Sequence, residues 1–222
     1  EYNETAEVAF ENIEKTGEIK VTKTTVGNIN VSGITFNLRG TSDSGREIDI
    51  PATTDENGVA VFSKIPVGKY TIYEDEKTVS AAYLVADEQE VTVKYNETAE
   101  VAFENIEKTG SIVVHKTTEG QKNIEGIKFY LRGTSDTGRE INIPATTDKD
   151  GVAVFENVPV GTYMVIEDEK TVPYGYLVAA EKEVTVIDRT ENAQSVVEII
   201  KLSESPMSAI GVEAFAEGSA EP

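Results

Sequence analysis

The chain has 222 residues, a formal net charge of −20 at pH 7, no cysteine, no tryptophan and one histidine. Such acidity argues against nucleic acid and anionic lipid as partners, and the lack of cysteine excludes disulfides, thiolate metal sites and thiol nucleophiles. No stretch is apolar for long enough to insert into a membrane. The hydrophobic fraction of 39% is nevertheless enough for compact cores.

The sequence contains an internal repeat with a long period. Residues 2–17, YNETAEVAFENIEKTG, return unchanged at 95–110, a period of 93 residues. This period is too long for a solenoid repeat and predicts whole domains in tandem. We expect two full units at 17–109 and 110–202, the last strand of a preceding unit at 1–16, and a flexible acidic tail or linker at 203–222.

Within a unit the signals are those of β-strands. Short alternating runs rich in Val, Ile, Thr, Phe and Tyr are separated by turn residues such as Asn57-Gly58. About seven strands at this spacing predict an all-β fold in which each unit is a β-sandwich. The strands of the first unit are expected near 18–25, 33–39, 46–51, 58–63, 69–75, 89–95 and 98–106.

Three of these strands place a polar residue where the alternation turns inward. In GEIKVTKTT, Lys23 follows two apolar residues on the same face, and Glu74 in KYTIYED and Asn105 in EVAFENI do the same. Burying a lone amine, carboxyl or amide is costly, whereas burying them beside one another costs much less. We therefore expect the three side chains to meet in the core.

Such a trio has the groups needed for a cross-linking reaction. Desolvation lowers the pKa of a buried amine, and a neutral amine is a nucleophile. A protonated carboxyl can polarise a carboxamide by hydrogen bonding to it. Attack by the Lys23 nitrogen on the Asn105 side-chain carbon, with Glu74 as the proton shuttle, would release ammonia and leave an amide bond. The alternative, which the pattern alone favours, is a buried ion pair without covalent chemistry.

Four pieces of the unit occur in a characteristic order: IKVTK, GITFNLRG, DENGVAVFSKIPVGKYTIYE and VAFEN. In this arrangement residues 17–109, and most of 110–202, resemble the Cna B-type (SpaA-like) domains of Gram-positive surface adhesins and pilins. The resemblance implies an immunoglobulin-like or prealbumin-like β-sandwich. It also implies a self-formed isopeptide bond, which by position joins Lys23 to Asn105 with Glu74 as the catalytic residue.

The second unit departs from this pattern. Lys116 and Glu167 take the expected positions, but the offset of 93 from Asn105 reaches Glu198, which has no carboxamide. We expect no isopeptide bond there, and instead a buried ion pair of Lys116 with Glu167, joined by Glu198. Asn12 repeats Asn105 in the first segment, so its lysine partner would belong to a preceding unit. The alternative for Asn12 is strand addition to a neighbouring molecule.

Other polar residues give no sign of a metal site, a cofactor site or an active site for an external substrate. His115 falls on the outward face of its strand, where surface decoration is the expected role. The acidic runs lack the alternating ligands and the glycine of a calcium loop. One outward histidine is no basis for a nucleophile triad.

The expected function is mechanical. Tandem units with short junctions would form an extracellular stalk on a cell-wall-anchored surface protein, with neighbouring repeats as its partners. The alternative is a module that binds a host matrix protein or glycan, for which the loops 26–32 and 119–125 are the main region of difference between the units. A third possibility is an accessory domain of a secreted enzyme.

Overall fold

The computed structural model describes residues 7–122, 124–187 and, for the backbone only, 197–202. Within these residues each repeat forms seven strands, which confirms the all-β prediction. The first unit contains β1 (Thr16–Thr25), β2 (Thr35–Ser42), β3 (Glu47–Thr53), β4 (Val59–Pro66), β5 (Gly68–Glu74), β6 (Gln89–Val93) and β7 (Thr98–Asn105). The second contains β8 (Thr109–Lys116), β9 (Lys128–Ser135), β10 (Glu140–Thr146), β11 (Val152–Pro159), β12 (Gly161–Glu167), β13 (Lys182–Val186) and β14 (Val197–Leu202).

The described helices are single 3₁₀ turns at the same places in both units. They are η1 (Val26–Asn28), η2 (Glu76–Thr78), η3 (Glu119–Gln121) and η4 (Glu169–Thr171). The expected tail at 203–222 and the first six residues lie outside the described part of the chain.

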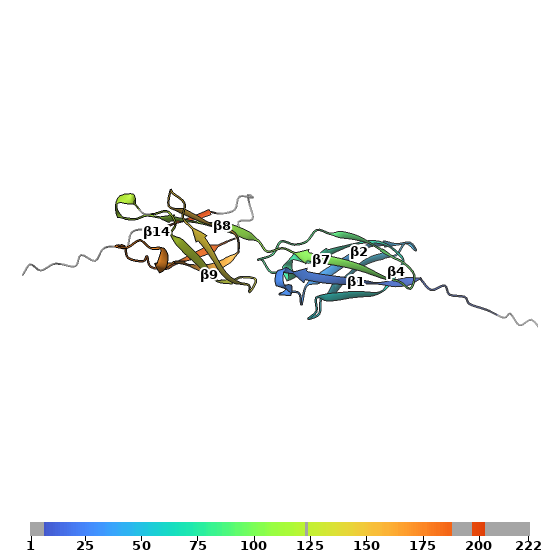
Figure 1. The fold of residues 1–222 in the computed structure, drawn as a ribbon. Coiled ribbons are helices and arrows are strands. Elements are labelled where there is room, and N and C mark those ends of the chain that lie inside the picture. Colours follow the sequence, from blue (N-terminus) through green and yellow to red (C-terminus); the bar gives the residue numbers. More distant parts are fainter. Residues whose placement is uncertain (1–6, 123, 188–196, 203–222) are drawn as a thin grey trace, which may run out of the picture.

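Each unit is a sandwich of two sheets (Figure 1). In the first unit a three-stranded sheet, β4-β1-β7, faces a four-stranded sheet, β3-β2-β5-β6. The second unit repeats this order with β11-β8-β14 and β10-β9-β12-β13. The first strand of each unit pairs antiparallel with the fourth and parallel with the last. The strands by which the chain enters and leaves a unit therefore lie side by side.

The core follows from the alternation of each strand. In β1, Ile19 and Val21 are fully buried, whereas Lys20 between them is partly exposed. The inner faces of the opposite sheet contribute residues such as Phe36, Leu38 and Ile72 to the same cluster. Burial of this apolar area is the main force that holds the two sheets together.

A tight turn between β3 and β4, which belong to different sheets, supports the middle of the three-stranded sheet. Gly58 has a φ of +73°, and a Cβ atom there would lie 2.5 Å from the Lys23 carbonyl oxygen. The Gly58 carbonyl accepts a hydrogen bond of 2.7 Å from the Lys23 amide. Only glycine satisfies both the backbone angle and the close approach, so the turn fixes the backbone that carries Lys23.

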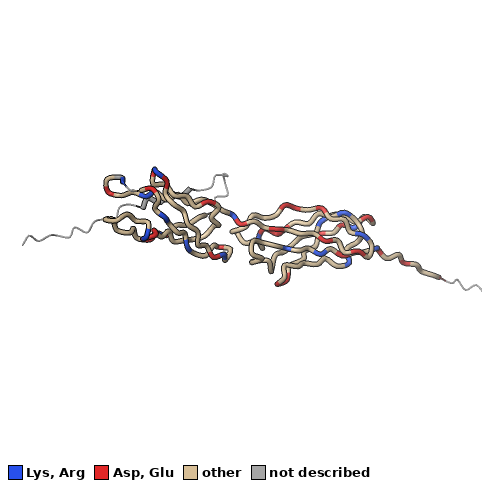
Figure 2. Tube along the Cα trace, viewed as in Figure 1, with Lys and Arg blue, Asp and Glu red and all other residues tan. Residues whose placement is uncertain are grey.

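The two units lie end to end, with the chain entering and leaving at opposite ends of the pair (Figure 1). The junction is short: β7 ends at Asn105 and β8 begins at Thr109. Acidic residues are spread along the chain of both units (Figure 2). In the described part of the chain, no helix has the length and apolar character needed to cross a membrane.

Candidate functional site

The first unit buries three polar side chains in its core. Lys23 on β1 and Asn105 on β7 come from the three-stranded sheet, and Glu74 on β5 comes from the opposite sheet. Their exposed fractions are 2%, 1% and 5%. Each follows two buried apolar residues on the same face of its strand, so the strand period itself turns it inward.

Lys23 and Glu74 form an ion pair out of contact with water. Lys23 Nζ lies 3.6 Å from Glu74 Oε1, and both side chains are completely buried. The amine also donates a 2.6 Å hydrogen bond to the Thr24 carbonyl, and Glu74 Oε2 accepts one of 3.0 Å from the Ala86 amide. Desolvation lowers the pKa of Lys23, although the nearby Glu74 carboxylate opposes this. Burial thus moves the amine toward its neutral, nucleophilic form.

Asn105 is the unusual member of the site. Neither atom of its carboxamide has a hydrogen-bond partner among the described residues, and Glu74 Oε1 has none either. Buried polar atoms are normally hydrogen-bonded, and an unpaired one costs about 1–3 kcal/mol. On β7, Asn105 is paired with Thr25 of β1, two positions beyond Lys23 on the same face. The Asn105 carboxamide is therefore buried without a hydrogen bond from the described residues to offset its desolvation.

Two buried phenylalanines are the cross-strand neighbours of this ion pair. Phe36 is paired with Glu74 across β2 and β5, and Phe103 is paired with Lys23 across β7 and β1. Their rings lie 4.8 Å apart between centroids and are tilted by 44°. Buried aromatic rings next to an ion pair keep the local dielectric constant low, which strengthens the attraction between Lys23 and Glu74.

The second unit has two of the three residues in the same arrangement. Lys116 Nζ lies 2.7 Å from Glu167 Oε1, and both side chains are almost fully buried. Glu167 Oε2 accepts a 2.7 Å hydrogen bond from the Ala179 amide, as Glu74 does from Ala86. The lysine and glutamate are thus held as in the first unit, with a shorter distance between them.

The register of β14 corrects the expected place of Glu198. Glu198 is paired with Ile112, whereas the residue paired with Lys116 is Leu202. The constant offset fails because ten residues separate β13 from β14, against four between β6 and β7. Two positions beyond Leu202 the sequence has Glu204, which lies outside the described residues and carries no carboxamide.

Some members of the site were missed by sequence reasoning. The Ala86 amide is a backbone group in an irregular segment, and no side-chain pattern points to it. The burial of Phe36 could have been predicted, because the alternation of GITFNLRG places it on the same face as Leu38, and both are buried. His115 is half-buried and alternates with the buried residues of β8. Among the described residues, no group of His, Cys, Asp or Glu has an arrangement that would hold a metal ion.

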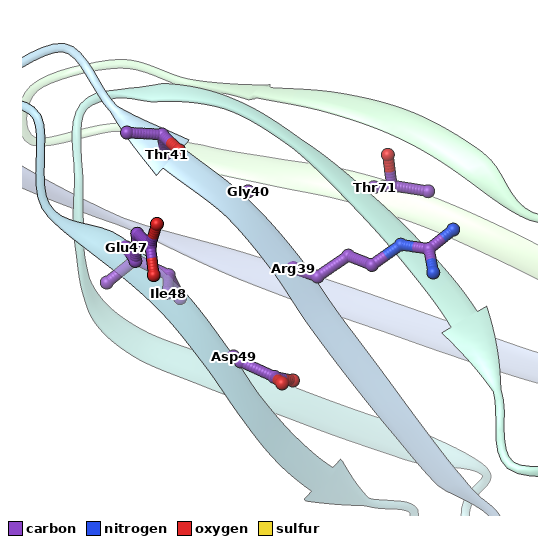
Figure 3. A pocket seen from close by; sticks show the side chains of 7 residues that line it. All are labelled: Arg39, Gly40, Thr41, Glu47, Ile48, Asp49 and Thr71. Atoms are coloured by element: carbon purple, nitrogen blue, oxygen red, sulfur yellow. The ribbon is translucent and has the colours of Figure 1, made fainter.

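A second feature is a shallow hollow of about 420 Å³ on the outer face of the larger sheet (Figure 3). Gly40, in β2, contributes backbone to its floor, and a Cβ atom there would lie 3.0 Å from both the Lys69 carbonyl oxygen and the Tyr70 ring. The hollow is lined by Arg39, Gly40, Thr41, Glu47, Ile48, Asp49 and Thr71. Side chains of both charges therefore surround it.

The fold is that of two β-sandwich domains in tandem. The model of the SpaA prealbumin-like fold domain matches residues 17–107 and again 110–201. The chain therefore belongs to this family, which confirms the resemblance noted from its motifs.

Comparison with solved structures finds similar chains at low sequence identity, of which the first shares the fold. The Bacillus anthracis TIE protein is 24% identical with a TM-score of 0.59, over 84% of this chain and 33% of that one. A streptococcal ancillary pilin is 20% identical with a TM-score of 0.38, over 86% of this chain and 63% of that one. GBS52, the minor pilin of Streptococcus agalactiae, is 17% identical with a TM-score of 0.36, over 86% of this chain and 97% of that one. The chain thus spans a third of the first protein and under two thirds of the second. No curated protein sequence matched it.

Proposed function

We propose that the two units are stalk repeats of a Gram-positive cell-surface adhesin or pilin-like protein, and that an isopeptide bond between Lys23 and Asn105 clamps the first unit. The observation that carries the proposal is the buried trio. A desolvated amine lies 3.6 Å from a buried carboxyl. On the strand next to that of the amine, two positions further along, a buried carboxamide has no hydrogen-bond partner among the described residues. Membership of the SpaA domain family supports the same role.

The reaction needs no external reagent. The neutral Lys23 amine attacks Cγ of Asn105, so an Nζ–Cγ bond forms and the Cγ–Nδ2 bond breaks. Glu74 takes a proton from Nζ and delivers it to Nδ2, which leaves as ammonia. The same carboxyl, when protonated, stabilises the carbonyl oxygen as charge develops on it. The rigid sandwich supplies proximity and orientation, and the reaction occurs once in each molecule.

The position of the bond suits a load-bearing role. Force along the chain enters at the start of β1 and leaves at the end of β7, and these two strands are parallel neighbours. A covalent link between Lys23 and Asn105 carries that force directly from one strand to the other. The pulling force then bypasses the residues between Lys23 and Asn105, so it does not separate the two sheets of the core.

A location outside the cell fits this role. A chain without cysteine has no disulfides, and an isopeptide bond takes over their function of constraining the unfolded chain. The net charge of −20 would keep densely packed stalks apart and soluble. Neighbouring repeats of the same protein are the partners that this arrangement implies.

The intact mass of the purified chain under denaturing conditions tests the proposal. We expect a deficit of one ammonia relative to the sequence mass. Lys23→Ala and Glu74→Gln should each restore the full mass, whereas the matched change Lys116→Ala in the second unit should leave the deficit in place. An unmodified mass for the folded wild-type chain would show that the trio is only a buried polar cluster.

The hollow on the outer sheet face favours a second candidate function, a module that binds a host glycan or matrix protein. Arg39, Asp49 and Thr71 offer donors and acceptors of both charges around a concave surface (Figure 3). A solid-phase screen against glycans and matrix proteins tests this candidate. Binding that is lost in Arg39→Ala but retained in Lys69→Ala would support it, and the absence of any binding would leave the stalk as the function.

A further inference from the structure

Specific side-chain and backbone contacts hold the junction between the two units. Glu107, just after β7, accepts a hydrogen bond of 2.5 Å from the Thr137 hydroxyl and pairs with Arg139 at 2.9 Å. The next residue, Lys108, accepts a 3.0 Å hydrogen bond from the Val160 amide. These contacts fix the direction in which the connecting segment enters the second unit.

The end of the first unit completes this interface. Ala82 is 4% exposed and belongs to the core cluster of the second unit, and its carbonyl accepts a 2.9 Å hydrogen bond from the Lys108 amide. From a neighbouring loop, Asn30 Nδ2 donates a 3.0 Å hydrogen bond to the Thr137 carbonyl. Thr137 is consequently buried. One face of the second unit is thus covered by the loop end of the first.

The first unit has the corresponding face at its own entry end, but among the described residues no other unit covers it. Glu14 accepts a hydrogen bond from the Ser44 hydroxyl and pairs with Arg46 at 3.1 Å, as Glu107 does with its two partners. Lys15 accepts a 3.0 Å hydrogen bond from the Val67 amide, which repeats the contact of Lys108. Ser44 and Arg46 are exposed, however, because the described residues place no unit in front of them. The connecting segment is therefore already held in the geometry of a junction.

The segment that leads into this face has the sequence of a strand but forms none in the described structure, where residues 7–15 are irregular. Its sequence is identical to that of β7 and the following junction. Val8 is 75% exposed and Phe10 is 94% exposed, whereas their counterparts Val101 and Phe103 are buried in the first unit's core. Large apolar side chains that alternate with polar ones are made to cover a core, and here they cover none among the described residues. Asn12 ends this segment as Asn105 ends β7.

We propose that this end of the first unit is a docking face for another unit of the same 93-residue repeat, whose closing strand includes residues 7–12 and whose cross-link is made by Asn12. The occupant is a unit that carries a lysine on its first strand and a glutamate opposite, as Lys23 and Glu74 are placed. Its lysine Nζ would bond to Asn12 Cγ as Nδ2 leaves with the shuttled proton as ammonia. The covalent step rests on the function proposed above, whereas the docking step does not.

A chain lengthened by one period tests the covalent step. One further copy of residues 2–94 is placed before Tyr2, so that the new unit is closed by the existing residues 2–16. We expect the lengthened chain to lose two ammonias, and its Asn12→Ala variant to lose one. The 222-residue chain should lose one with or without Asn12→Ala. A lengthened, folded chain that loses only one ammonia would overturn the assignment of Asn12. No loss in the 222-residue chain would instead refute the proposed Lys23–Asn105 bond.

Amide hydrogen exchange tests the docking step without relying on any bond. The amides of residues 7–12 should exchange fast in the 222-residue chain and become as protected as those of 100–105 in the lengthened chain. Fast exchange in both proteins would overturn the docking face. Sedimentation of the 222-residue chain at rising concentration provides a separate check. A dimer with protected amides at 7–12 would show that the occupant is a second molecule, and would overturn the assignment to a unit of the same chain.

Discussion

Removing the carboxamide of Asn105 isolates the contribution of the proposed bond. In Asn105→Ala the cross-link cannot form, while the pair of Lys23 with Glu74 stays in place. Both atoms of the Asn105 carboxamide lack a hydrogen-bond partner among the described residues, so the substitution breaks no such contact. The change in stability should therefore come mainly from the lost covalent constraint, with a smaller loss of packing.

The magnitude follows from the loop that the bond closes. Lys23 and Asn105 are separated by roughly 80 residues, for which the loop-entropy relation for cross-links gives about 4.5 kcal/mol at 25 °C. In a domain of this size each kcal/mol moves the melting temperature by about 4–8 °C, so the first unit should melt about 20–35 °C lower. The second unit has no Asn at this position and should melt as before.

Differential scanning calorimetry of the intact chain measures both transitions at once. We expect Asn105→Ala to lower the transition of the first unit and to leave that of the second unchanged, with the full sequence mass restored. Glu74→Gln provides a second uncross-linked protein of nearly unchanged shape and should behave similarly. If the mass is restored but the melting temperature falls by only a few degrees, the reasoning from loop entropy is wrong.

Three further outcomes are expected. Under tension in a force microscope the second unit should unfold, with a gain in length of roughly 3.3–3.6 Å for each of its residues, while the first unit should not; two such events per molecule would contradict the clamp. Replacing residues 188–202 with the sequence of 95–109 should give the second unit a cross-link to Lys116, seen as one more ammonia lost; an unchanged mass would show that Lys116 and Glu167 are not poised to react. Burial raises the pKa of Tyr163 from 10.0 to about 12, so the fold favours the protonated phenol. This stabilisation is present below pH 10 and is lost as the pH rises toward 12. Tyr163→Phe should remove that loss in alkaline melting curves, and identical curves would contradict it.

The sequence by itself determined the features that depend on short-range pattern. The repeat is visible as identical letters, and a strand period of two places Lys23, Glu74 and Asn105 on inward faces, where the structure buries them. Turn residues such as Gly58 marked the ends of strands because their backbone angles exclude most other residues. The all-β sandwich follows from these local rules together with the amount of apolar surface to be buried.

Only the tertiary structure decided which distant groups meet. The pairing of Glu198 with Ile112 depends on the length of the segment before β14, and a constant offset between the repeats cannot express that. The Ala86 amide reaches Glu74 from an irregular segment, and Ala82 enters the core of the second unit because the units are packed end to end. Such contacts arise from loop closure and packing between elements far apart in the chain, for which a local period in the sequence carries no signal.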